Sequence, residues 1–213
     1  MGHARANRNS PAGRQCSCPH GRPEVTASGA ATTTTWTVKP GGSVSGVARN
    51  VTMTDTATGS VLTCKTMTAK GTAKSGKGLP GAAIAKITSV TFTSCVGPDS
   101  LKFTITAGHL PWKLNAKSYN AATGVTKGTI TGAVASLSGN GCTATSAGPA
   151  PTTPATLAGT YTNAPHQLKT GGAGSNMHVW NVSSGCLGLI NSGDPVALKG
   201  TSTLAPAQTI TSP

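Results

Sequence analysis

Short runs of alternating apolar and polar residues, separated by turn residues, recur along the chain from Thr32 onward. In the clearest run, 101–107, Leu101, Phe103 and Ile105 alternate with lysine and threonine. Because successive side chains of a strand point to opposite faces, this run predicts a β-strand with one apolar face and one wet face. The same two-residue period appears at 51–53, 62–67, 90–92, 157–161 and 177–183.

Glycine, proline, asparagine and aspartate separate these runs at 58–60, 97–99, 139–141, 171–172 and 192–195, where they favour tight turns. The stretches 69–82 and 147–154 lack the alternation, and we expect longer loops there. Threonine and valine suit a pleated sheet better than a helix, because branching at Cβ restricts their side chains. The sequence therefore predicts an all-β fold, an antiparallel β-sandwich or a barrel.

Hydrophobic residues make up only 36% of the 213 residues, and small side chains take their place. This length suits a single domain, which we place at 32–213. The run 64–71 has a weak echo at 142–148, so a division into two related halves, about 44–116 and 125–213, is an alternative.

The segment 1–31 carries Arg5, Arg8, Arg14 and Arg22 and almost no apolar residues, so we expect a disordered basic arm. Nothing before Thr35 supplies the apolar run of an export signal, and we expect that such a signal has been lost or replaced. The alternative is a genuine basic arm that binds a polyanion.

Six cysteines without a Cys-x-x-Cys pair indicate disulfides, and therefore an oxidising compartment outside the cytoplasm. We expect Cys64 to pair with Cys95 and Cys142 to pair with Cys186, although four cysteines allow three pairings. Cys16 and Cys18, with a histidine two residues further on, resemble a metal clip, but we interpret them as incidental and predict no metal site.

The chain has 17 lysines and arginines against four acidic residues, a formal net charge of +13. Such a charge favours an anionic partner, for example a cell-envelope polymer, although the lysines also serve simply to keep a threonine-rich surface soluble. Aromatic residues are only 3% of the chain, too few for the stacking platforms on which single-strand binders hold bases. We therefore do not expect a nucleic acid as the partner. No run reaches the length of a transmembrane helix.

The sequence contains no nucleophile elbow, zinc-protease motif, phosphate loop or dinucleotide fingerprint, so we predict no cofactor and no catalytic residues. The acidic residues of the domain, Asp55, Asp99 and Asp194, all lie at predicted turns, where carboxylates usually cap backbone amides. A small secreted hydrolase remains an alternative, and it would need a histidine beside a nucleophile.

Two local features are candidate ligand sites. The lysines around the predicted loop 69–82 form the densest basic patch, and we expect them to contact an anion unless they only solvate the loop: Lys65, Lys70, Lys74 and Lys77. In the run GHLPW at 108–112, a ligand could stack on Trp112 beside His109. The alternative, which we favour, is that Trp112 fills the core.

The runs VTFTSC at 90–95, GHLPW at 108–112, GTYTN at 159–163 and GCLGL at 185–189 resemble exported β-rich proteins of unknown function in actinobacteria such as Streptomyces. This resemblance covers residues 32–213 and implies a secreted or cell-surface location, without supplying any catalytic residue. We therefore expect an exported, non-catalytic binding or surface protein that contacts an anionic envelope component or a protein partner. A structural subunit of an extracellular assembly is a further alternative.

Overall fold

Threonine and valine are frequent in residues 34–213, the part of the chain that the computed structural model describes, and strands dominate there. The branched side chains fit the pleated surface of a sheet. Between 34 and 213 there is no α-helix, only the 3₁₀ helices η1 (Pro98–Ser100) and η2 (Ser184–Cys186), so the all-β prediction is confirmed. The strands are β1 (Thr35–Lys39), β2 (Gly42–Asp55), β3 (Val61–Ala73), β4 (Gly76–Pro80), β5 (Ala85–Val96), β6 (Lys102–Gly108), β7 (Trp112–Asn120), β8 (Val125–Gly139), β9 (Cys142–Ala147), β10 (Ala155–Thr162), β11 (Gln167–Thr170), β12 (His178–Trp180), β13 (Val196–Ala205) and β14 (Thr209–Thr211).

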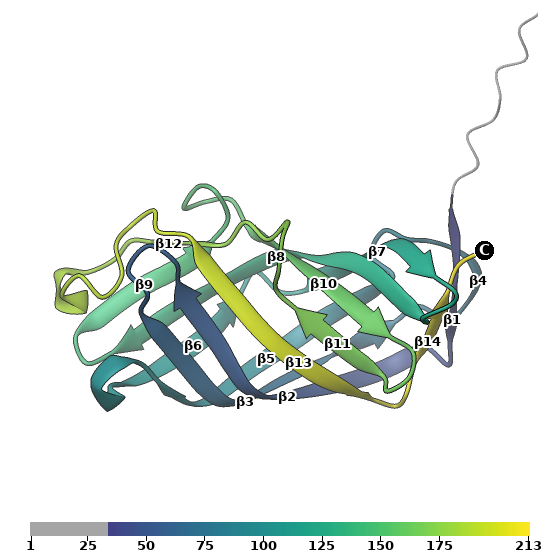
Figure 1. Ribbon diagram of the computed structural model, residues 1–213, viewed down its shortest axis with the longest axis horizontal. Coiled ribbons are helices and arrows are strands. Elements are labelled where there is room, and N and C mark those ends of the chain that lie inside the picture. The colour runs from purple at the N-terminus through teal and green to yellow at the C-terminus, as the bar shows by residue number, and fades with distance from the viewer. Residues whose placement is uncertain (1–33) are drawn as a thin grey trace, which may run out of the picture. The chain divides into compact units, whose positions relative to one another are not determined.

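The main sheet closes on itself to form an antiparallel barrel (Figure 1). Its hydrogen-bonded neighbours follow the order β2, β3, β5, β6, β8, β10, β11 and β13, and β13 then pairs with β2. Each wall strand thus lies beside the next one along the chain, which is the up-and-down arrangement. Of the two architectures that the sequence predicts, the barrel is the one observed. Because the sheet is closed, this ring of strands has no free edge.

Three positions in the wall are held by strands that are interrupted partway along the barrel. β6 and β7 both lie between β5 and β8, and they are separated at 109–111. β9 and β10 both pair with β8, with an insertion at 148–154. β11 pairs with β10 and β12 pairs with β9, with an insertion at 171–177. The three interruptions lie at neighbouring positions in the wall.

A second sheet of three strands, in the order β14, β1, β4, covers one end of the barrel and is called the cap (Figure 1). Trp36 and Val38 of β1 are buried, and with Ile84 they pack against Leu114 of the wall and Ile210 of β14. We call this the cap end. The far end carries the β2–β3, β5–β6, β8–β9 and β12–β13 connections.

The cap is tied to the wall by Gln208, whose side chain is buried. Its Oε1 accepts a hydrogen bond from the Gly41 amide at 3.0 Å, and its Nε2 donates to the Pro206 carbonyl at 3.0 Å. The Gln208 carbonyl accepts from the Tyr161 hydroxyl of β10 at 2.7 Å. One residue of the β13–β14 connection therefore joins the β1–β2 connection to β10 of the barrel.

The alternation of inward- and outward-facing residues along β2 is interrupted at Asn50, which has a φ of 52°. Ala48 and Val51 are both fully buried although they are three residues apart. Asn50, in the left-handed region, moves the inward-facing positions of β2 by one residue. The pairing of β2 with β3 continues on both sides of it. Ser94 of β5, with a φ of 49°, lies in the same part of the wall, next to the buried Cys95.

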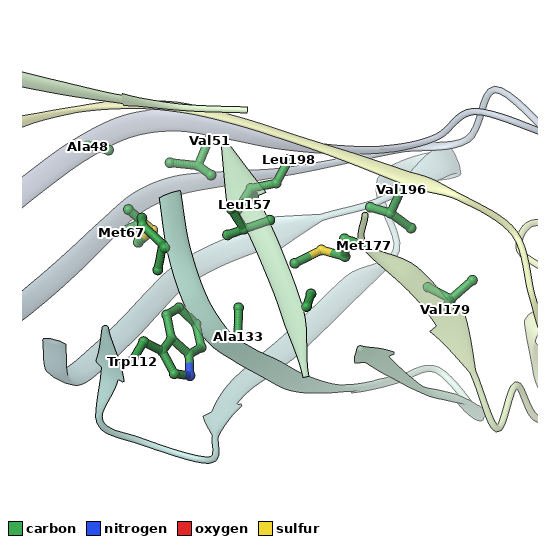
Figure 2. Close-up of a cluster of buried hydrophobic side chains, with 12 residues drawn as sticks. Ala48, Val51, Met67, Trp112, Ala133, Leu157, Met177, Val179, Val196 and Leu198 are labelled. Carbon is green, nitrogen blue, oxygen red and sulfur yellow. The ribbon is translucent and has the colours of Figure 1, made fainter. Parts of the chain in front are cut away.

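Apolar side chains from most of the wall strands fill the barrel interior. Figure 2 shows Met67 and Trp112 toward one end of this cluster and Val179 and Val196 toward the other. Val51, Ala133 and Met177 lie between the two ends (Figure 2). Burial of this cluster is the main source of stability, at roughly 1.5–3 kcal/mol for each large side chain.

Both expected disulfides are present. Cys64 lies directly opposite Cys95 on the neighbouring strands β3 and β5. Cys142 at the start of β9 is joined to Cys186, which belongs to η2.

Two predicted boundaries are wrong. The stretch 69–82 is not a loop, since β3 continues to Ala73 and β4 follows, and the threonine- and glycine-rich end of β3 is paired on both sides. Gly71 is required there because a Cβ would lie 2.0 Å from the Lys86 carbonyl oxygen. The predicted strand 177–183 is limited to β12, because residues 181–195 form the connection to β13.

The possible halves 44–116 and 125–213 supply adjacent strands to one closed barrel. The predicted arm at 1–31, with Cys16 and Cys18, lies outside the described residues.

Candidate functional site

An apolar cavity of about 100 Å³ lies inside the barrel, beneath the cap. Side chains from β2, β3, β5, β7, β8, β10, β11 and β13 form its wall, and Val38 and Ile210 of the cap form its end. We call this the cap-end cavity. The side chains around it are mostly aliphatic, and they include Val44, Met67, Ile87, Trp112, Leu157 and Leu198.

The two largest uncharged polar side chains at the cap-end cavity lie where the cap joins the wall, and Ser45, Thr170 and Ser202 of the wall strands also line it. Tyr161 and Gln208 both line it, and the hydrogen bond between them holds the phenol in place. Burial raises the pKa of Tyr161 above its usual value, and the hydrogen bond to the Gln208 carbonyl partly opposes this rise. The phenol is therefore a neutral donor at physiological pH, and its partner is already supplied by the protein.

Trp112 contributes to this cavity from the start of β7. Its side chain is buried, and its Nε1 donates a hydrogen bond to the Gly108 carbonyl at 2.8 Å across the β6–β7 interruption. His109 lies in the interruption itself, exposed and with a φ of 55°. The two residues therefore do not form one surface: Trp112 belongs to the interior of the barrel and His109 to the outside.

The four lysines expected to form a basic loop lie on strands or beside them. Lys65 and Lys70 project outward from β3. Their backbone positions are about 17 Å apart along the strand, at the usual rise of a β-strand per residue. Lys77 is exposed on β4, whereas the Lys74 Nζ donates to the Ala82 carbonyl at 3.1 Å. They are thus spread along the wall and the cap, and whether they contact an anion remains a prediction.

The structure brings other lysines together that the sequence did not single out. Lys86 of β5 lies directly opposite Lys113 of β7 on the outer wall. Lys117 and Lys127 line an open groove of about 500 Å³ next to the glycine-rich insertion 171–174. The fold brings these pairs together, although Lys86 and Lys113 are 27 residues apart in the chain and Lys117 and Lys127 are 10 apart.

The acidic residues of the described chain are confined to one end of the barrel, whereas lysines occur along its whole length. Asp55 ends β2, Asp99 lies in η1 and Asp194 precedes β13, so all three acids lie at the far end. The predicted capping role is confirmed for Asp55 and Asp194. Asp55 Oδ1 accepts from the amides of Ala57 and Thr58, and Asp194 Oδ2 accepts from the amide of Asn191. The cap end carries lysines and no acid.

Two of the three described histidines are engaged with backbone carbonyls. His166 Nδ1 donates to Gln208 at 3.2 Å, and His178 Nδ1 donates to Asn176 at 3.1 Å. Among residues 34–213, no three His, Cys, Asp or Glu side chains come together as metal ligands. In the same part of the chain, no helix is long and apolar enough to cross a membrane.

No protein-family model matches the chain, and no significant match was found among the curated proteins or the solved structures. The class that the fold defines is an up-and-down β-barrel with a capped, apolar interior cavity.

Proposed function

We propose that this protein is an exported, non-catalytic binding protein that holds a small apolar molecule in the cap-end cavity. The observation that supports this proposal is a largely apolar cavity inside a closed eight-stranded barrel, in which the Tyr161 hydroxyl is already paired with the Gln208 carbonyl. A barrel of eight strands has an interior that is either filled by side chains or wide enough for one small ligand. Export is part of the proposal, and the two disulfides fit an extracellular protein.

The size and lining of the cavity limit the ligand. A dry apolar cavity of about 150 Å³ holds a benzene-sized molecule, and the cap-end cavity of about 100 Å³ is somewhat smaller. Met67 lines it, and the flexible thioether chain can adjust to admit a slightly larger guest. The ligand class is therefore a small hydrocarbon-like molecule, with no charge to be buried.

Titration of the full-length protein with benzene and cyclohexane, followed by NMR, tests this proposal. We expect saturable chemical-shift changes at residues that line the cap-end cavity. Ala69→Leu places a larger side chain in the cavity from β3 and should weaken binding about tenfold or more, which corresponds to about 1.4 kcal/mol. The matched control is Ala122→Leu, in the exposed β7–β8 turn, which should bind as the unmodified protein does. Absence of saturable shifts, or equal binding by both variants, would overturn the proposal.

A second candidate function is attachment to an anionic cell-envelope polymer, which the presence of lysines and the absence of described acidic residues at the cap end favour. Lys86 and Lys113 lie directly opposite each other, an arrangement that destabilises a sheet by roughly 0.2–1 kcal/mol. An anionic group bound between them would remove this repulsion. The far end, where the three acids lie, would face away from such a polymer.

Cosedimentation of the full chain with bacterial cell envelopes across a salt series tests this second candidate. We expect binding to fall as salt rises, because exposed charges are screened. The double change Lys86→Gln and Lys113→Gln should weaken binding more than Lys102→Gln with Lys199→Gln, which removes the same charge nearer the far end. Equal effects of the two double changes, or no binding at low salt, would exclude the cap-end lysines. Binding that persists at high salt would indicate a protein partner or an assembly role instead.

A further inference from the structure

The carboxylate of Asp55 lies inside the barrel at the far end, with one oxygen fully bonded and the other without a partner. The residue is 3% exposed, and it follows Val51 and Met53 on the inward face of β2. Its Oδ1 accepts hydrogen bonds from the amides of Ala57 and Thr58, both at 2.9 Å. Its Oδ2 is buried and accepts none.

The turn alone does not explain an aspartate at this position. Asparagine, whose amide oxygen accepts the same two hydrogen bonds, would hold the β2–β3 turn as well. The negative charge and Oδ2 are therefore in excess of what the turn requires. A buried carboxylate without a compensating group costs several kcal/mol, so a partner is expected in the functional state.

Asp55 lines a second cavity, of about 70 Å³, which we call the far-end cavity. Its wall is apolar, with Met53, Phe103, Ile105, Leu137, Val179 and Val196 among the lining side chains. The two cavities have no lining residue in common, and core side chains such as Val51 and Met177 lie between them. The β2–β3, β5–β6 and β12–β13 connections each contribute residues to the rim of the far-end cavity.

No lysine, arginine or histidine lines the far-end cavity, so the described chain offers Asp55 no counter-ion there. A metal ion would need further oxygen or nitrogen ligands, and no cluster of three such acidic, histidine or cysteine side chains exists in the described residues. The apolar wall instead suits a hydrocarbon body, and the single carboxylate oxygen suits one charged donor. We propose that the far-end cavity binds a small organic cation, in which an ammonium group pairs with Asp55 Oδ2 and a short alkyl chain occupies the apolar space.

Calorimetric titration of the full-length protein at neutral pH with n-butylammonium chloride, and with n-butanol as the neutral analogue, tests this proposal. We expect one butylammonium ion per chain and weaker binding of butanol. Asp55→Asn keeps the oxygen that holds the turn and removes the charge, so it should weaken butylammonium binding about tenfold or more, because the hydrogen bond between two charged groups is lost. Asp194→Asn, which changes another turn carboxylate at the same end, is the matched control and should bind as the unmodified protein does.

Equal affinity of the unmodified protein and Asp55→Asn would overturn the proposal, as would the absence of saturable binding by any ammonium ion from ethyl to hexyl. If Asp55→Asn fails to fold, the comparison of butylammonium with butanol on the unmodified protein still decides between the outcomes, because equal binding of the two contradicts a role for charge. Ala69→Leu at the cap-end cavity should leave butylammonium binding unchanged. The result is therefore independent of the neutral-ligand proposal, which is tested at the other end of the barrel.

Discussion

Replacing Trp112 with alanine is expected to lower the free energy of unfolding by about 3–5 kcal/mol, measured by chemical denaturation. The indole is buried in the central core cluster, and its removal leaves a void that the rigid barrel wall cannot fill. The change also removes the hydrogen bond from Nε1 to the Gly108 carbonyl, which joins the two sides of the β6–β7 interruption. Loss of packing and loss of this bond therefore act in the same direction.

Trp112→Phe is the matched variant, because it keeps an aromatic ring in the core while it removes the hydrogen bond from Nε1 and the smaller ring of the indole. It should cost clearly less than the alanine change, and the difference reports the packing contribution. A loss below about 1 kcal/mol for Trp112→Ala would contradict the assignment of this residue to the core. It would restore the alternative in which the ring serves as a ligand platform.

Removing the Cys142–Cys186 disulfide, by changing both residues to alanine, is expected to lower the free energy of unfolding by about 4 kcal/mol. The bond closes a loop with a sequence separation of 44, and it fixes the long β12–β13 connection to the start of β9. The chain-entropy argument gives a similar value for Cys64–Cys95, whose separation is 31.

The two bonds differ in what else holds their ends. β3 and β5 are joined by an extensive ladder around Cys64 and Cys95, whereas Cys186 lies in a short helix beside β9. Proteolysis should therefore cut residues 181–195 soon after the Cys142–Cys186 bond is lost, and leave 61–96 intact when the other bond is lost. Equal protection of 181–195 with and without its disulfide would contradict this prediction.

Much of the fold follows from local sequence pattern. The alternation at 101–107 corresponds to β6 with a shift of one residue, and the disulfide pairs are those expected from spacing along the chain. The barrel could not be separated from a sandwich, because that choice depends on whether β13 pairs with β2, a contact between distant residues. The end of β3 was missed because its outer and inner positions are both small or polar, so no alternation marks it.

The candidate sites were harder to predict than the fold. The cap-end cavity is lined by residues from eight wall strands and the cap, and no local pattern reports a space that is enclosed only after closure. Asp55 was recognised as a turn acid, but its burial depends on Asn50, which changes the face of β2 on which the last residues lie. Asparagine adopts a positive φ more readily than most residues, but most asparagines do not adopt it, so Asn50 alone does not predict the change.

Closure of the ring also determines when the protein can first exist as a folded unit during its synthesis. The ladder between β2 and β13 joins residues about 150 positions apart, such as Ala48 and Ser202. When the chain emerges from a ribosome or a translocation channel with its N-terminal side first, β2 can pair with β3 early. Its other edge has no β13 to pair with until almost the whole described chain has emerged. Over that period the strand is open to pairing with other chains, which makes the interval before closure the point at which this protein is most exposed to aggregation.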